Sequence, residues 1–361
     1  MGEVAFLKKL IKFQTYDNNE NFHHEVSALY DFFESLTPKG YLCKRYEKLG
    51  YSSLLVLPQG VELKLLLQGH IDVVPGQSKQ FIPQIQNGRL YGRGSSDMKF
   101  AAACYLKLLN DLNRPDLPFG VCLTSDEEVG GFNGVKYLLD SGLIDCEICF
   151  LPDGVNNWAI VEKEKGVLHG KLTAKGIAAH GSTPWLGISA TEILIMALSE
   201  LQNNDVFIKT NGKNNWHNTL NVGVIAGGVA TNVVPALAEA RIDMRFINKD
   251  AEKVIFESIS QICGKYKLDF ETLVLGQSFH IKRSNPYVVQ YQNVLKQHGV
   301  KYKWENDHGA SDGRFFSEHD IPVILSKPIC GGDHTDEEWI DIKSLKTYYQ
   351  TLKAFVLEVT E

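Results

Sequence analysis

The chain has 361 residues, of which 44% are hydrophobic and 22% are charged, and its formal net charge is −6. This length exceeds one comfortable hydrophobic core and predicts two domains, while the composition is ordinary for a globular protein. An acidic chain without a basic run or a nucleic-acid-reading motif gives no reason to expect nucleic acid as a partner. No segment is long and apolar enough to span a bilayer, so no membrane partner is expected either.

The N-terminal segment MGEVAFLKKLIKFQTYD repeats apolar residues at helical spacing. It lacks the uninterrupted apolar run of a signal peptide, and we therefore expect a cytoplasmic protein. The seven cysteines are spread along the chain and do not form a disulfide framework. Cys146 and Cys149 form a C-x-x-C pair inside an apolar, strand-like run, which favours buried, inert thiols over a zinc or redox site.

Helical and strand patterns alternate in the first 165 residues. They predict helices over 2–13 and 23–36 and strands over 52–57 and 62–68. A helix, a strand, a second helix and a second strand are then expected over 100–112, 119–125, 130–142 and 146–152. This alternation is typical of the α/β class, with a mixed, largely parallel sheet flanked by helices.

The pattern changes at Gly166. Strand and helix patterns now follow in the order β-α-β-β-α-β, over 166–176, 188–201, 219–228, 235–246, 250–266 and 267–276. This is the ferredoxin-like, split βαβ order, in which a four-stranded antiparallel sheet packs against two helices. The α/β pattern then resumes with a strand at 321–328 and a helix at 342–358. We therefore expect a discontinuous domain of residues 1–165 and 276–361, with an inserted domain of residues 166–275.

Histidine and acidic side chains follow several predicted strands of the discontinuous domain. Residues i and i+2 of a strand point to the same face, so His70 and Asp72 in LQGHIDVVP should project together. The other residues of this kind are Asp97 in GRLYGRGSSDMK, Glu127 and Glu128 in LTSDEEVGG, Asp153 in CFLPDG and His334 in GGDHTDEEW. Each alone could be a helix cap or a solvated charge in a turn. Together, at one sheet edge, they fit the ligands of zinc, cobalt or manganese.

The segments GHIDVVP, GRLYGRGSSDMK, TSDEEVGG and DHTDE, in this order, resemble the M20 co-catalytic metallopeptidases. This family includes desuccinylases, deacetylases, aminoacylases, carboxypeptidases and dipeptidases. The resemblance covers essentially the whole chain and implies a zinc-peptidase-like catalytic domain. It also implies that residues 166–275 are the lid, or dimerisation, domain of a homodimer.

The resemblance further implies two divalent ions, with zinc as the first choice and cobalt or manganese as alternatives. His70, Asp97 and Asp153 would surround one ion. Asp97, Glu128 and His334 would surround the other, so that Asp97 bridges the pair. Paired ions of this kind activate a shared water for hydrolysis.

The remaining roles implied by the resemblance concern catalysis and substrate binding. Asp72 would orient the imidazole of His70, and Glu127 would be the general base. His180, in GIAAHGSTPW, would stabilise the oxyanion, often in the partner subunit's active site. Asn232, in GGVATNVVP, would lie near the substrate. Arg314, in GASDGRFF, would bind a substrate carboxylate through its guanidinium fork, as in desuccinylase-like members.

Three departures from the family pattern leave the substrate open. Phe100 follows DMK where many relatives have glycine, and Asp153 occupies a position that is Glu in many deacylases. The segment between Pro75 and GRLYGRG is short and lacks the common tryptophan. We expect a hydrolase that acts on the amide bond of a small N-acyl amino acid, and a desuccinylase-like enzyme is the leading expectation. The alternatives are an acetylornithine-type deacetylase, a dipeptidase or carboxypeptidase acting on a small peptide, and a non-catalytic metal-binding protein.

Overall fold

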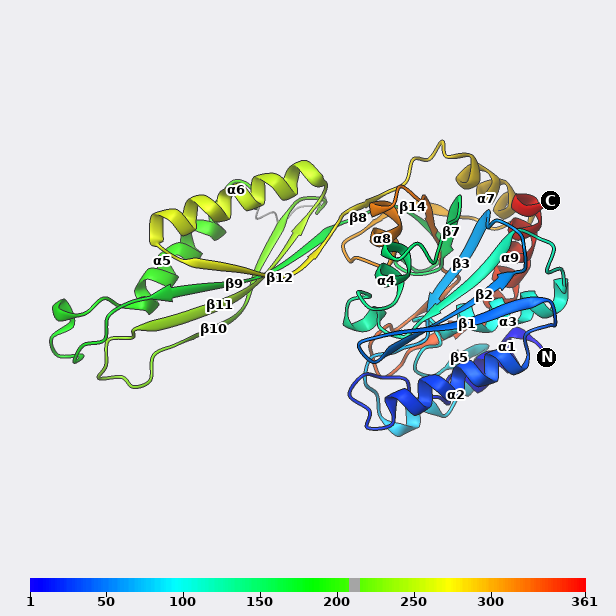
Figure 1. Ribbon diagram of the computed structural model, residues 1–361, viewed down its shortest axis with the longest axis horizontal. Helices are drawn as coiled ribbons and strands as arrows, with labels where there is room; N and C mark the ends of the chain where they lie inside the picture. Colours follow the sequence, from blue (N-terminus) through cyan, green and yellow to red (C-terminus); the bar gives the residue numbers. More distant parts are fainter. Residues whose placement is uncertain (208–214) are drawn as a thin grey trace. The chain divides into compact units, whose positions relative to one another are not determined.

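Figure 1 shows the computed structural model, which describes residues 1–207 and 215–361. The described chain divides into two compact units. The first unit contains Met1–Lys163, His280–Asp307 and Ser311–Glu361, and the second contains Glu164–Phe279 and His308–Ala310.

The first unit is built on a six-stranded sheet. In spatial order its strands are β1 (Tyr41–Lys48), β2 (Tyr51–Pro58), β6 (Phe119–Thr124), β3 (Leu65–His70), β7 (Ile148–Leu151) and β15 (Val323–Leu325). The last four run parallel to one another, whereas β2 runs antiparallel to both of its neighbours, β1 and β6. Strands β3, β6 and β7 are buried throughout, as expected of parallel strands covered on both faces. The predicted α/β class with a mixed, largely parallel sheet is confirmed.

Helices surround this sheet (Figure 1). They are α1 (Glu3–Leu10), α2 (Phe22–Ser35), α3 (Lys99–Leu112), α4 (Val135–Asp140), α7 (Pro286–Gln297), α8 (Gly313–Glu318) and α9 (Ile342–Thr360). Helices α3 and α9 pack on β3 and on each other, while α2 packs on β2. Aromatic rings fill the core between them, and the Phe150 ring contacts the rings of Tyr291, Tyr348 and Phe355.

The chain also forms two smaller sheets from short strands. One has the order β13-β8-β14 and consists of β8 (Ala159–Glu164), β13 (Phe279–His280) and β14 (Lys303–Asp307). The other has the order β16-β17-β5-β4 and consists of β4 (Gln84–Gln86), β5 (Arg89–Tyr91), β16 (Cys330–Gly331) and β17 (Trp339–Asp341). The pairing of β5 with β17 joins two loops far apart in sequence, one containing Asp97 and the other His334.

The second unit has its own antiparallel sheet, in the order β10-β11-β9-β12. Its elements are β9 (Gly166–Lys175), α5 (Ala190–Gln202), β10 (Thr219–Gly227), β11 (Leu237–Phe246), α6 (Lys249–Tyr266) and β12 (Asp269–Gly276). Both helices lie on one face of the sheet (Figure 1). Alternate residues of β11 are buried, which places Ile242 and Met244 in a core shared with α5 and α6. This element order is the β-α-β-β-α-β order expected from the sequence.

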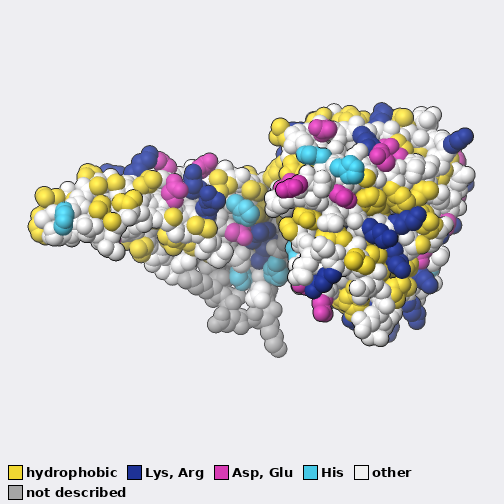
Figure 2. Space-filling view, turned by 90° about the horizontal axis from the view of Figure 1, so that it is seen from below, with side chains coloured by type: hydrophobic (Ala, Val, Ile, Leu, Met, Phe, Trp, Pro, Cys, Tyr) yellow, Lys and Arg dark blue, Asp and Glu magenta, His cyan; other side chains and the backbone are white. Residues whose placement is uncertain are grey.

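The surface and the cysteines agree with the composition. On the face drawn in Figure 2, basic, acidic and apolar side chains are intermingled on each unit. Within residues 1–207 and 215–361, no helix has the length and hydropathy needed to cross a bilayer. Cys146 and Cys149 are both buried and unpaired, as predicted. Burial raises the pKa of the Cys146 thiol to about 12, which makes it a poor nucleophile at neutral pH.

Candidate metal centre

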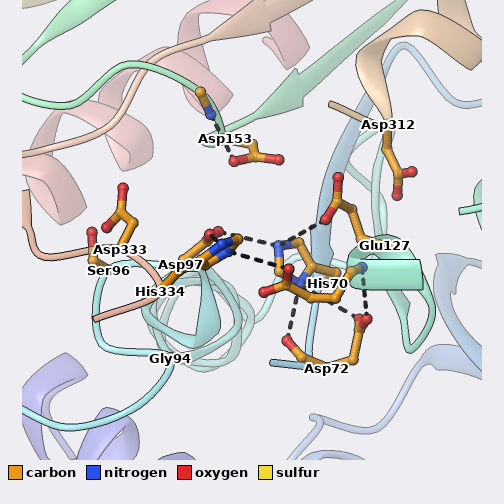
Figure 3. Close-up of polar contacts among 12 residues, drawn as sticks. His70, Asp72, Gly94, Ser96, Asp97, Glu127, Asp153, Asp312, Asp333 and His334 are labelled. Atoms are coloured by element: carbon orange, nitrogen blue, oxygen red, sulfur yellow. Dashed lines mark hydrogen bonds and ion pairs between the residues drawn. The ribbon is translucent and has the colours of Figure 1, made fainter. Parts of the chain in front are cut away.

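His70 is the last residue of β3 and lies at the carboxyl end of the parallel sheet. Its side chain is 1% exposed. Its Nδ1 lies 3.0 Å from the backbone carbonyl oxygen of Asp72 and 3.5 Å from the Oδ1 of the same residue. Its Nε2 faces the opposite way, 3.3 Å from Asp97 Oδ1 and 3.9 Å from Glu127 Oε2 (Figure 3). One ring nitrogen is therefore fixed by Asp72, and the other is directed at the carboxylates.

Asp97 lies in the turn that precedes α3, and Glu338 holds this turn in place. Glu338 Oε1 accepts the backbone N–H groups of Ser96 at 2.8 Å and Asp97 at 3.0 Å. Glu338 Oε2 accepts the N–H of Gly94 at 3.0 Å and Arg93 Nη1 at 2.8 Å. Glu338 is 2% exposed, so these bonds form away from water. The sequence reasoning missed Glu338, although it lies four residues after His334 in the same acidic turn.

Glu127 and Glu128 share the single 3-10 turn η2 (Glu127–Val129), which follows β6. The backbone N–H of Glu128 donates to Asp72 Oδ2 at 3.0 Å, which ties this turn to the segment after β3. Glu127 faces His70, whereas Glu128 Oε2 lies 3.2 Å from His334 Nε2. The same His334 nitrogen is 3.2 Å from Asp97 Oδ2. The turn thus directs two adjacent carboxylates to different neighbours.

Asp153 follows β7 and approaches the same region from the opposite side (Figure 3). Its Oδ1 accepts the N–H of Gly154 at 2.6 Å and lies 3.4 Å from the Nζ of Lys327. Lys327 follows β15, and its side chain is 2% exposed. A buried ammonium among these carboxylates was not expected from the sequence, where SKP reads as an ordinary strand end.

Two groups of side chains offer ligand atoms that all lie within 4.8 Å of one another. One group is His70, Asp97 and Asp153, and the other is Asp97, Glu128 and His334, with Asp97 in both. These are the two sets named from the sequence. Imidazole and carboxylate groups suit zinc, cobalt and manganese. Glu128 Oε1 is buried without a hydrogen-bond partner, as a carboxylate oxygen awaiting a cation would be. The residues therefore fit a pair of divalent ions.

The pKa values of these groups record a strongly acidic cluster. Burial opposes ionisation of Asp97, but Lys327, His334 and His70 outweigh it and hold its pKa well below the usual range. Burial raises the pKa of Glu127 well above its usual value, with further contributions from nearby carboxylates. Hydrogen bonds to Asp97 and Glu128 raise the pKa of His334 to about 10.

His180 and Asn232 lie in the second unit, and its fold brings them together. The backbone N–H of Gly181 donates to the carbonyl oxygen of Asn232 at 2.7 Å, and His180 is bridged to Val233. The backbone N–H of Ser182 donates to His180 Nδ1 at 3.1 Å. Because Nδ1 is an acceptor there, the neutral ring carries its proton on Nε2 and can donate from that nitrogen. Both side chains are exposed.

Arg314 lies in the first unit, on α8, and is 5% exposed. Its Nη1 donates to the carbonyl oxygen of Ser311 at 3.1 Å, and its Nη2 donates to that of Gly130 at 2.7 Å. Its Nε is buried without a hydrogen-bond partner. Arg314 therefore holds the turn that follows Glu128, and a substrate carboxylate would have to compete with these backbone carbonyls.

Known proteins are similar to this chain in sequence and in fold. Succinyl-diaminopimelate desuccinylase of Polaromonas naphthalenivorans is 28% identical over 348 residues, covering 90% of this chain and 84% of the relative. A tripeptidase of Staphylococcus aureus has a TM-score of 0.80 at 22% identity, covering 99% of this chain and 97% of the other. A dinuclear metal binding peptidase of the M20 family from Bacillus subtilis has a TM-score of 0.69 at 14% identity, covering 99% and 97%. Residues 66–358 match the model of peptidase family M20/M25/M40, and the chain therefore belongs to this family.

Proposed function

We propose that this protein hydrolyses the amide bond of a small N-acyl amino acid, with a succinylated amine as the first candidate substrate. Membership of the family makes the chain a metal-dependent amidohydrolase. The observation that carries the proposal is the pair of ligand groups that share Asp97, with the partly buried carboxylate of Glu127 beside them. The relatives named succinyl-diaminopimelate desuccinylase support the choice of acyl group.

The proposed metal ligands are His70, Asp97 and Asp153 for one ion and Asp97, Glu128 and His334 for the other. When bound, a pair of divalent ions supplies Lewis acidity, which polarises an amide carbonyl and lowers the pKa of water. Zinc is the first choice for this ligand set, and cobalt and manganese are the alternatives.

In this proposal Glu127 takes a proton from the attacking water and delivers it to the departing amine nitrogen. Its position supports the role, because it faces His70 without being one of the five proposed ligand residues. Burial raises its pKa, which makes its carboxylate a stronger base for this proton transfer. Asp72 keeps the Nδ1 of His70 occupied, so that Nε2 faces the carboxylates.

His180 is proposed to donate a hydrogen bond from Nε2 to the oxyanion that forms on the substrate. The bond from the Ser182 N–H to Nδ1 supports this role, because it places the imidazole proton on Nε2. Asn232 is proposed to contact the substrate from the same loop pair.

We also propose a homodimer formed through the second unit. β10 is an edge strand of its sheet, and its Val224 and Ile225 are 51% and 59% exposed. An edge strand with exposed apolar side chains is a ready surface for pairing with a second copy.

The contacts of Arg314 also support a second class of substrate. Both Nη atoms of Arg314 already donate to backbone carbonyls. A substrate whose acyl group carries no carboxylate at its side of the amide bond, such as an acetylated amine or a peptide, therefore suits the structure as well. Purified protein with added zinc or cobalt should be assayed on N-succinyl and N-acetyl forms of one amino acid and on a dipeptide. Preference for the N-succinyl form is expected, and removal of metal with a chelator should abolish turnover reversibly. Turnover of the dipeptide alone would replace the deacylase proposal with a peptidase.

A further inference from the structure

Lys327 places a positive charge inside one of the two proposed ligand groups. Its Nζ lies 3.4 Å from Asp153 Oδ1 and 3.6 Å from Asp97 Oδ1, and both residues belong to the group completed by His70. A third carboxylate, Asp333, has its Oδ2 3.8 Å away. In the described chain, the ion pairs of Lys327 reach these three residues and do not reach Glu128 or His334.

The two ligand groups therefore differ in charge although their donor atoms are alike. Each can supply one imidazole and two carboxylates, with the Asp97 carboxylate shared. Both carboxylates of the group of His70, Asp97 and Asp153 lie close to the Lys327 ammonium, whereas in the other group only the shared Asp97 does. A divalent ion held by His70, Asp97 and Asp153 meets a like charge at short range in a buried site, where water screens poorly.

Asp333 gives the ammonium an alternative partner. Its side chain accepts a hydrogen bond from Asn156 Nδ2 at 3.1 Å, which fixes one oxygen, and its Oδ1 is buried without a hydrogen-bond partner. Lys327 can turn from Asp97 and Asp153 towards this oxygen when a cation takes its place. The cost of admitting that cation then depends on both members of the Lys327–Asp333 pair.

We propose that Lys327 is an internal competitor for the ion held by His70, Asp97 and Asp153, and that Asp333 is the residue that receives it. Because of this, the ion held by Asp97, Glu128 and His334 binds first and more tightly. The inference rests on the proposed function, since it concerns the same centre. It assigns Lys327 and Asp333 a positioning role, in which they act on the metal through charge.

The test is calorimetric titration of chelator-treated, full-length protein with zinc ions, with metal content measured after dialysis. In the native protein we expect two binding steps that differ by at least tenfold in affinity. Lys327→Met, which keeps the length of the side chain and removes its charge, should tighten the weaker step by about tenfold or more. Asp333→Asn should weaken the same step. Lys327→Arg, which keeps the charge, and Lys346→Met, at an exposed position of α9, are the matched controls and should leave the weaker step close to its native affinity.

Two further variants assign the steps to sites. In a His334→Ala background, Lys327→Met should still tighten the remaining ion. In an Asp153→Ala background, the remaining ion should respond by less than twofold. Thermal unfolding of each variant reports whether it folds.

Several results would overturn the inference. One is a Lys327→Met protein that folds and binds both ions with native affinity, and another is one that binds both less tightly, as loss of a purely structural lysine would produce. A change confined to the ion of Glu128 and His334 would also contradict it. Failure of every folded variant and of the native protein to bind zinc would instead overturn the proposed function, and this inference with it.

Discussion

Glu338 fixes the position of Asp97 through a hydrogen bond to its backbone N–H. Its Oε1 accepts the Asp97 N–H at 3.0 Å, while its Oε2 forms a buried ion pair with Arg93 at 2.8 Å. Asp97 is the residue shared by both proposed ligand groups. A residue without contact to either ion can therefore set the position of the carboxylate that joins them.

Replacing Glu338 should weaken the binding of both proposed metal ions. Glu338→Gln leaves the Arg93 guanidinium without its buried counter-charge and turns one acceptor into a donor facing backbone N–H groups. Breaking a buried pair in this way typically costs about 3–5 kcal/mol of stability. We expect a lower unfolding temperature and loss of affinity at both zinc sites, measured by thermal unfolding and calorimetry.

Tyr30→Phe is the matched control for that experiment. The Tyr30 hydroxyl is buried and lies 2.9 Å from the carbonyl oxygen of Ser52 and 3.0 Å from that of Leu123. This variant should lower the unfolding temperature without changing zinc affinity. If Glu338→Gln likewise lowers the unfolding temperature and leaves zinc affinity unchanged, Glu338 supports the fold and does not position Asp97.

Glu127→Gln should separate proton transfer from metal binding. The amide has nearly the same size as the carboxylate but cannot accept a proton, so turnover should fall by roughly 10²–10⁴-fold. Metal content, measured on the same preparation, should stay at the native level. Loss of one ion would identify Glu127 as a ligand, and Glu128→Gln would then be the variant that keeps its metal.

Much of this centre could be predicted because its residues follow strands in recognisable short segments. His70, Asp97, Glu128, Asp153 and His334 all stand at strand ends or tight turns, and the structure gathers them as two groups. Lys327 and Glu338 escaped prediction for a physical reason. Their roles depend on which loops lie opposite them, and that is set by the parallel pairing of β15 with β7 and the pairing of β17 with β5. Short strands such as β16 and β17 also gave no periodic pattern to read.

Zinc binding should release protons and tighten as pH rises. The pKa of His334 is about 10 in the metal-free protein, raised by hydrogen bonds to Asp97 and Glu128, so its ring is protonated at pH 7. An ion needs the neutral imidazole, and binding must displace this proton. Apparent affinity should therefore rise with pH until about pH 10, by up to tenfold per unit for each proton displaced.

The same shift has the opposite sign for the stability of the metal-free protein. Because the folded-state pKa of His334 lies above the unfolded value of about 6.5, its stabilising contribution is complete below that pH. It is lost as pH rises through about 10. Calorimetry in two buffers of different ionisation enthalpy counts the released protons. His24→Ala, at an exposed position of α2, should release as many as the native protein, and His334→Ala should release fewer. Equal release by all three proteins would contradict the assignment.

His180→Ala should lower kcat by roughly 10²–10³-fold with a smaller change in KM, as expected for loss of one oxyanion donor. Zinc content should not change, because His180 belongs to neither ligand group. If the residue acts in the partner subunit's site, mixing His180→Ala and Glu127→Gln proteins should restore part of the activity. Absence of recovery, despite measured exchange of subunits, would place His180 in its own subunit's site or outside catalysis.

Arg314 provides the sharpest division between the candidate substrates. A succinyl group has a terminal carboxylate that an acetyl group lacks, and a hydrogen bond to a charged group is worth about 1.5–3 kcal/mol. If Arg314 binds that carboxylate, Arg314→Lys should cost about 10–100-fold in kcat/KM on the N-succinyl substrate, because an ammonium cannot form the fork. The loss on the N-acetyl form of the same amine should be slight. The contacts to Ser311 and Gly130 add a second expectation, since losing them should loosen the turn after Glu128 and lower the unfolding temperature. Equal losses on both substrates with unchanged stability would indicate that Arg314 binds the α-carboxylate instead. Equal losses with a fall in stability and weaker zinc binding would make it a support for the Glu128 turn, and the preference for a succinyl group would then rest on the relatives alone.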